Sequence, residues 1–173
     1  ADPAPTVARM AELGVLAVIL PEARPAALTA LVAEEQRQKV GPDALRRLAA
    51  LLPAEATLAE QVAARFRLSG AQKKRLARAA ARDGHVADPR ALAYRLGAEQ
   101  ATDRLLLSGQ DIAPITGWAI PIFPLKGGEI VARGVKAGPE VARILQTVEN
   151  CWVAEGFPDA ARVQALLDAV LAE

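Results

Sequence analysis

The chain has few of the residues on which disulfide and metal sites depend. Its 173 residues include one cysteine and one histidine. A single cysteine forms no internal disulfide, which fits a reducing compartment, and we expect Cys151 to be a buried, inert thiol within a helix. His85 has no second histidine or cysteine at metal-ligand spacing, so we expect it in a surface loop and predict no metal site.

Motifs for catalytic chemistry are also missing. Nucleotidyl transfer needs clustered carboxylates that hold Mg²⁺ against triphosphate oxygens, and no Asp-x-Asp pair occurs in the sequence. The sequence has no Walker A pattern and no dinucleotide-binding fingerprint. Any serine-histidine-aspartate triad would have to use the single histidine, and no arrangement of serine, histidine and aspartate along the chain suggests such a triad. We therefore predict no catalytic residue and no cofactor in this chain.

Long hydrophobic runs are absent as well. The longest, residues 15–20, is much shorter than the roughly 20 apolar residues of a membrane span. It is also too short for the apolar region of a signal peptide. We therefore expect a cytoplasmic protein without membrane contact. The sequence begins Ala-Asp-Pro-Ala-Pro without methionine, which looks like a cut inside a longer protein, whereas nothing indicates an oligomeric state.

What the chain does contain favours helices. Hydrophobic residues make up 52% but aromatic residues only 3%, so the apolar content is mostly alanine, leucine and valine. Small side chains of high helix propensity favour closely packed helices over a sheet, and helical periodicity dominates the sequence. We predict an all-α fold with an irregular multi-helix bundle, the body, at residues 1–110. A connection rich in proline and aromatic residues (111–128) and a small helical tail domain (129–173) follow it.

Capping signals predict where several helices begin and end. The expected N-caps are Thr6, Thr57, Ser69 and Asp88. The helix after Ser69 is expected to continue to about Arg82, and Gly97 is expected to separate or kink two helices. A further short helix is expected near residues 112–119, inside the connection.

The most basic stretch of the chain, residues 65–82, contains no acid. Its candidate phosphate-binding residues are Lys73, Lys74, Arg75, Arg78 and Arg82. On one continuous helix Lys74, Arg78 and Arg82 would share a face, and like charges at this spacing repel by a few tenths of a kcal/mol per pair. A polyanion along that face would relieve the repulsion and release counterions. The alternative is a solvated helix face with acids supplied by a neighbouring helix.

A second cationic feature lies at residues 126–141. Gly134 and Gly138 precede a helix that Pro139 is expected to start, and glycines there let a phosphate approach free backbone N–H groups. We treat them as a candidate helix-start anion site, with Lys126, Arg133 and Lys136 as candidate phosphate contacts. The alternative is a tight turn in which glycine merely fits.

Three aromatic side chains leave two roles open. Trp118, Phe123 and Trp152 are able to stack on bases. With so few aromatic residues in the chain, anchoring of the hydrophobic core is the favoured role.

Residues 127–141, with Leu145, Glu149, Trp152 and Gly156-Phe157-Pro158, resemble the C-terminal region of bacterial tRNA nucleotidyltransferases of the poly(A) polymerase-like class. Family members often show Gly-x-Asp-Leu-Ile-x-x-Gly-hydrophobic-x-x-Gly-Pro-x-hydrophobic-Gly there. This chain has Glu129 in place of the aspartate and Ala142 in place of the last glycine. Residues 10–22 and 67–76 are similar to segments of the family's helical body.

The resemblance implies a function without catalysis by this chain. In the family an N-terminal head holds the metal carboxylates, and a helical body and tail grip tRNA. This chain looks like body and tail, which implies binding of tRNA or other structured RNA beside a missing N-terminal catalytic head. That head would use Mg²⁺ and CTP or ATP to add CCA, or poly(A), to RNA 3′ ends. The alternatives are a helical protein-interaction or oligomerisation module and, disfavoured by the missing carboxylates, a free-standing enzyme.

Overall fold

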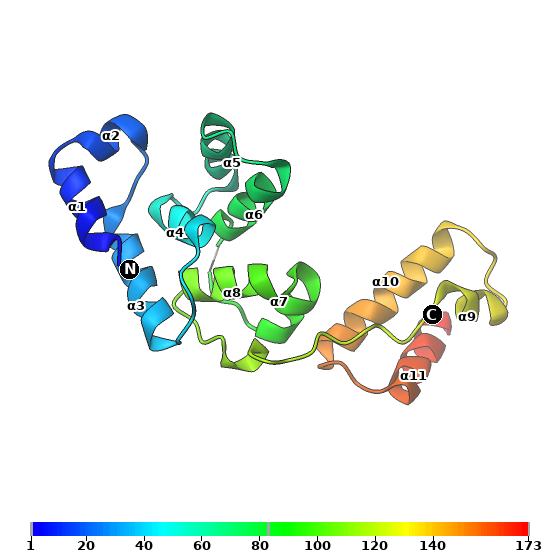
Figure 1. The fold of residues 1–173 in the computed structure, drawn as a ribbon. Coiled ribbons are helices and arrows are strands. Elements are labelled where there is room, and N and C mark those ends of the chain that lie inside the picture. Colours follow the sequence, from blue (N-terminus) through cyan, green and yellow to red (C-terminus); the bar gives the residue numbers. More distant parts are fainter. Residues whose placement is uncertain (1, 83, 173) are drawn as a thin grey trace. The chain divides into compact units, whose positions relative to one another are not determined.

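The computed structural model describes residues 2–82 and 84–172 and is all-α (Figure 1). These residues form 11 α-helices and no strand, and 65% of the chain is helical. The predicted all-α, multi-helix class is thereby confirmed. The chain divides into two compact units, residues 1–118 (unit 1) and 119–173 (unit 2). The division lies inside the segment predicted as the connection, at residues 111–128.

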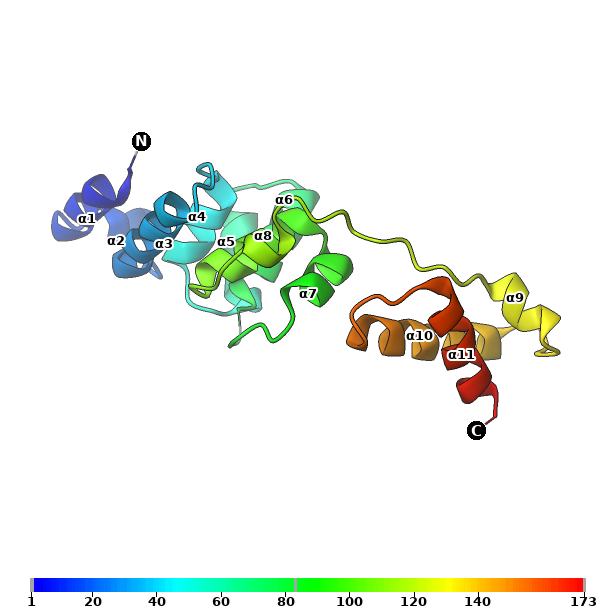
Figure 2. The ribbon, with the colours of Figure 1, turned by 90° about the horizontal axis from the view of Figure 1, so that it is seen from below.

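Unit 1 contains eight α-helices and one short 3₁₀ turn among its described residues (Figures 1 and 2). They are α1 (Ala4–Glu12), α2 (Val15–Ile19), α3 (Pro25–Arg37), α4 (Ala44–Leu51), α5 (Ala56–Arg65), α6 (Gly70–Ala80), α7 (Pro89–Leu96), α8 (Ala98–Leu107) and η1 (Ala113–Ile115). The helix expected at 112–119 is therefore only the η1 turn. The turn ends at Thr116, whose backbone is extended (φ −68°, ψ 117°), and Gly117 follows in a left-handed conformation (φ +70°).

The predicted helix starts are half correct. Ser69 and Asp88 cap α6 and α7: the Ser69 hydroxyl accepts from the Gln72 backbone N–H at 3.3 Å, and Gln72 Oε1 accepts from Ser69 N at 2.9 Å. The predicted N-caps Thr6 and Thr57 are wrong, because each residue lies inside its helix. Gly97 separates α7 from α8, as predicted.

The core of unit 1 has two main parts. In the first part, Leu52, Val62 and Leu76 are fully buried among α2, α4, α5 and α6. In the second part, Leu31 and Leu105 are buried together with alanines of α7 and α8. Burying each leucine or valine stabilises the fold by about 1.5–3 kcal/mol. Alanines at the contacts, such as Ala59 and Ala80, let α5 and α6 approach closely.

Unit 2 consists of α9 (Gly127–Ala132), α10 (Pro139–Ala154) and α11 (Ala160–Leu171). Trp152 is 2% exposed, and its ring lies 5.1 Å from that of Phe123 and 5.0 Å from that of Phe157. Its indole Nε1–H donates to the Pro158 carbonyl at 2.8 Å. Trp152 is therefore the core anchor that was predicted, with its one polar group satisfied.

The remaining isolated residues have ordinary surroundings. His85 lies exposed in a loop, as predicted, whereas Cys151 is only half-buried in α10 and not fully buried as expected. Trp118 is half-buried, with the Arg90 guanidinium 5.5 Å from its ring centroid. In the described ranges, no helix has the length and apolar character needed to cross a membrane.

Candidate nucleic-acid interface

An open groove of about 390 Å³ runs between α5 and α6 in unit 1 and carries three of the predicted phosphate-binding residues. Its lining consists of Ala56, Glu60, Gly70, Lys73, Lys74, Ala77, Arg78 and Ala81. Four of these eight residues are glycine or alanine, so short side chains separate the charged ones. We refer to this feature as the α5–α6 groove.

The charges of the α5–α6 groove are mostly uncompensated. Lys74 is exposed, and Lys73 Nζ lies 3.5 Å from Glu60 Oε2 with both side chains about half exposed (44% and 50%). An exposed pair at this distance contributes little and leaves the lysine available to another anion. Arg78 donates to the neutral Gln100 Oε1 at 2.8 Å and keeps its full charge. Three cations and one carboxylate therefore give the groove a positive potential.

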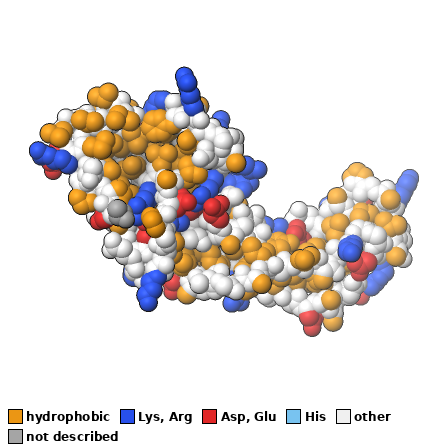
Figure 3. Space-filling view, viewed as in Figure 1, with side chains coloured by type: hydrophobic (Ala, Val, Ile, Leu, Met, Phe, Trp, Pro, Cys, Tyr) orange, Lys and Arg blue, Asp and Glu red, His pale blue; other side chains and the backbone are white. Residues whose placement is uncertain are grey.

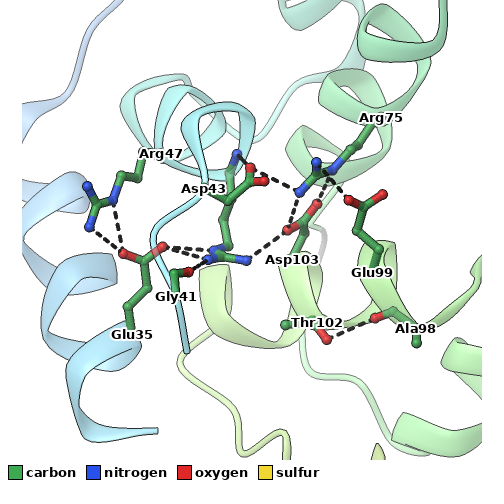
Figure 4. A network of polar contacts seen from close by, with 10 residues as sticks. Glu35, Gly41, Asp43, Arg47, Arg75, Ala98, Glu99, Thr102 and Asp103 are labelled. Carbon is green, nitrogen blue, oxygen red and sulfur yellow. Dashed lines mark hydrogen bonds and ion pairs between the residues drawn. The ribbon is translucent and has the colours of Figure 1, made fainter. Parts of the chain in front are cut away.

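Arg75 lies on the same helix but serves a structural network (Figure 4). It pairs with Asp103 at 2.7 Å, with Asp43 at 3.0 Å and with Glu99 at 3.0 Å, and its side chain is 14% exposed. Hydrogen bonding to Asp103 and then to Asp43 raises the pKa of Arg75 above its ordinary value, although burial opposes the shift. The Arg75 guanidinium is thus already paired with three carboxylates of the protein.

Arg82 does not share a helix face with Lys74 and Arg78, because α6 ends at Ala80 and not near residue 82 as expected. The Arg82 guanidinium donates to the Ala49 carbonyl at 3.1 Å and to the Leu52 carbonyl at 2.7 Å. These carbonyls stand at the C-terminal end of α4, where helices leave acceptors unsatisfied. Burial, with the nearby charge of Arg24, lowers the pKa of Arg82.

The candidate cations of unit 2 differ in their surroundings. Arg133 pairs with Asp168 and donates to Gln164 at 3.2 Å, so its charge is matched within the unit. Lys126 and Lys136 are exposed, at the N-cap of α9 and between α9 and α10. These two lysines are the predicted cations of unit 2 that remain open to a ligand.

The two candidate glycines have conformations that favour glycine. Gly134 has φ +92° and Gly138, the N-cap of α10, has φ +152°. Glu140 lies in the first turn of α10 and pairs with Arg143 at 2.6 Å. These features fit the alternative of a tight helix–helix turn and give no separate sign of a bound anion.

Three charged residues are fully buried, and the sequence did not lead us to predict this. Arg46 donates to Glu35 at 2.9 Å and pairs with Asp103 at 3.3 Å, and all three are at most 4% exposed. Arg47 also donates to Glu35, at 2.9 Å. The only sequence signal was Asp103 on the apolar face of α8, between Ala101 and the buried leucines. Across the described part of the chain, no group of three or more histidine, cysteine or acidic residues is arranged to hold a metal ion.

The geometry therefore defines an all-α chain of two helical units, the first bearing a small-residue groove flanked by cations. Comparison with protein-family models, with curated proteins and with solved structures gave no match.

Proposed function

We propose that this chain is the RNA-binding C-terminal portion of a tRNA nucleotidyltransferase that adds CCA, or poly(A), to RNA 3′ ends. Its role is to bind tRNA or another structured RNA in the cytoplasm. Catalysis, with Mg²⁺ and CTP or ATP, belongs in this proposal to a head domain outside the chain. The family assignment rests on the sequence resemblance, and the assignment of RNA binding rests on the α5–α6 groove.

The observation that carries the proposal is the gathering of Lys73, Lys74 and Arg78 around a groove of small residues. RNA backbones are bound mainly by lysine and arginine contacts to phosphates, which release counterions. Small side chains let a phosphate backbone approach the helices without steric conflict. The contacts proposed here are therefore the three cations of the groove, with Lys126 and Lys136 as additional contacts in unit 2. Arg75 and Arg133 drop out as primary contacts because their charges are paired within the protein, and Arg82 drops out because it does not line the groove.

The test is a binding measurement with matched charge variants. A double variant, Lys73→Gln with Lys74→Gln, removes two groove charges, and Arg9→Gln with Lys39→Gln removes two exposed charges elsewhere in unit 1. We expect the groove variant to bind tRNA at least tenfold more weakly at fixed salt, and the control variant to bind within about twofold of the wild type. Equal weakening by both pairs would mean that only net charge matters and would reject the groove.

A second candidate function is a helical protein-interaction or oligomerisation module. It is favoured by the exposed apolar side chains of the α1–α2 segment: Leu13 is 61%, Val18 86% and Ile19 48% exposed. Hydrophobic side chains gather over this end of unit 1 (Figure 3). Contiguous exposed apolar side chains often mark protein contacts.

Competition between RNAs separates the two candidates. Displacement of labelled tRNA by unlabelled tRNA and by a single-stranded RNA of equal length is measured at one salt concentration. Shape recognition predicts that the single strand competes at least tenfold less well. An interaction module with incidental charge predicts weak binding and equal competition by both RNAs.

A further inference from the structure

A separate cavity of unit 1 combines an apolar wall with a cation that has no acidic partner among the described residues. The cavity measures about 350 Å³ and lies between α3 and α8. Its apolar lining includes Ala30 and Leu31 of α3, Ala50 of α4, and Leu106 and Leu107 of α8, and Arg82 also lines it. This size lies within the usual range of small-molecule sites.

The charge balance of the cavity is uneven. Two lining residues are charged, Glu34 and Arg82. Glu34 is already neutralised, because Arg37 Nη2 donates to its carboxylate at 2.6 Å and Gln38 Nε2 at 2.9 Å. The Arg82 guanidinium donates to the Ala49 and Leu52 carbonyls, and no described carboxylate lies within ion-pair distance of it. The guanidinium therefore keeps an uncompensated charge beside apolar surface.

A second cation strengthens this imbalance. The Arg24 backbone N–H donates to the Leu51 carbonyl at 2.7 Å, so Arg24 and Arg82 both attach to the C-terminal end of α4. Arg24 is exposed. Burial of Arg82 and, to a lesser degree, the nearby charge of Arg24 lower the pKa of Arg82. One cation in the wall of an apolar cavity, with a second cation near enough to act on its charge, favours a ligand with one negative charge and an apolar body.

We propose that the α3–α8 cavity binds a small carboxylic acid with an apolar body, whose carboxylate pairs with Arg82 while its hydrocarbon part contacts Leu31, Leu106 and Leu107. A guanidinium with donors left over binds a carboxylate through charge-assisted hydrogen bonds. The site is independent of the α5–α6 groove, since the two share no lining residue.

The probe is hexanoate, with hexanamide as its neutral counterpart, titrated into the ¹⁵N-labelled chain and followed by amide chemical shifts. We expect saturable shifts at residues of the cavity wall for hexanoate and at least tenfold weaker binding of hexanamide. Arg82→Gln keeps a donor for the α4 carbonyls but removes the charge, and it should weaken hexanoate binding at least tenfold.

A steric variant keeps the test decisive if Arg82→Gln perturbs the fold. Ala30→Leu fills the cavity from the exposed side of α3, and Ala26→Leu adds the same side chain to an exposed position of α3 outside the cavity. We expect Ala30→Leu to abolish the hexanoate shifts and Ala26→Leu to leave them unchanged. No saturable shift at millimolar hexanoate, or equal binding by both leucine variants, would overturn the proposal.

Discussion

Arg75 on α6 and Asp103 on α8 form a two-point ion pair, with Nε–Oδ2 at 2.7 Å and Nη2–Oδ1 at 3.0 Å. Asp103 is 1% exposed and also accepts from Arg46 of α4. One carboxylate therefore joins three helices of unit 1. The pair also lets α6 pack against α8, since the central arginine of this basic helix is neutralised internally.

The first prediction concerns this shared carboxylate. Asp103→Ala leaves Arg46 with a buried, partly unpaired charge and should lower the free energy of unfolding by about 3–5 kcal/mol. Glu12→Ala removes the exposed Arg9–Glu12 pair and should cost less than about 1 kcal/mol. Urea unfolding followed by circular dichroism measures both. Similar small losses for the two variants would show that the network contributes little.

The second prediction concerns Arg82 as a cap of α4. Arg82→Met keeps the length of the side chain but removes the hydrogen bonds to the Ala49 and Leu52 carbonyls, so we expect a loss of about 1.5–3 kcal/mol in unfolding free energy. Arg78→Met removes one hydrogen bond to an amide and should cost no more than about 1 kcal/mol. Equal losses in urea unfolding would argue against capping by Arg82.

The third prediction concerns stability at acid pH. Burial raises the pKa of Asp43, but hydrogen bonds from the Arg46 backbone and from Arg75 outweigh it, and the net pKa lies below the ordinary value of 3.8. The unfolded chain therefore binds the proton more readily than the folded chain. The contribution of Asp43 is present above the ordinary value and is lost as pH falls through the lower folded pKa.

The measurement is the urea midpoint of the wild type and of Asp43→Asn as pH is lowered from neutral to strongly acid. The wild type should lose more stability over the acid range than the variant does, because only the wild type has this carboxylate to protonate. Parallel curves would contradict the assigned role of Asp43.

The fourth prediction uses two adjacent glycines of α9. A Cβ added at Gly127 would lie 3.2 Å from Val141 Cγ1 of α10, whereas a Cβ at Gly128 meets nothing within 4 Å. Gly128→Ala should leave stability unchanged or raise it by up to about 1 kcal/mol, because alanine favours helix. Gly127→Ala should be less stable than Gly128→Ala, since the Val141 side chain must give way to the added Cβ.

Trp152 fluorescence in a Trp118→Phe background reports the unfolding of unit 2 for both variants. The ranking is the test. If Gly127→Ala proves at least as stable as Gly128→Ala, then α9 and α10 do not approach as closely as described.

The sequence was sufficient to predict the fold class, because helical periodicity and the caps Ser69 and Asp88 are local signals. Where α6 ends was not predictable in this way. The basic run continues to Arg82, but Arg82 turns away to satisfy α4, a partner about 30 residues earlier in the chain. Such long-range capping leaves no local pattern.

The candidate site was predicted in outline only. The sequence identified residues 65–82 as the most basic stretch, yet it could not separate Lys74, which is exposed, from Arg75, which is bound to acids of α4 and α8. Arg46 was overlooked because a charged residue is rarely expected inside a core. Its burial depends on Glu35 and Asp103, which lie on two other helices, 11 and 57 residues away in the sequence.

The most direct test of RNA binding by the α5–α6 groove is the salt dependence of tRNA affinity. Plots of log affinity against log salt are compared for the wild type and for the chain carrying Lys73→Gln and Lys74→Gln. Each lost phosphate contact lowers the slope by about 0.7–0.9, so the groove variant should have a slope shallower by about 1.5. The control with Arg9→Gln and Lys39→Gln should retain the wild-type slope. An unchanged slope in the groove variant would contradict the proposed interface.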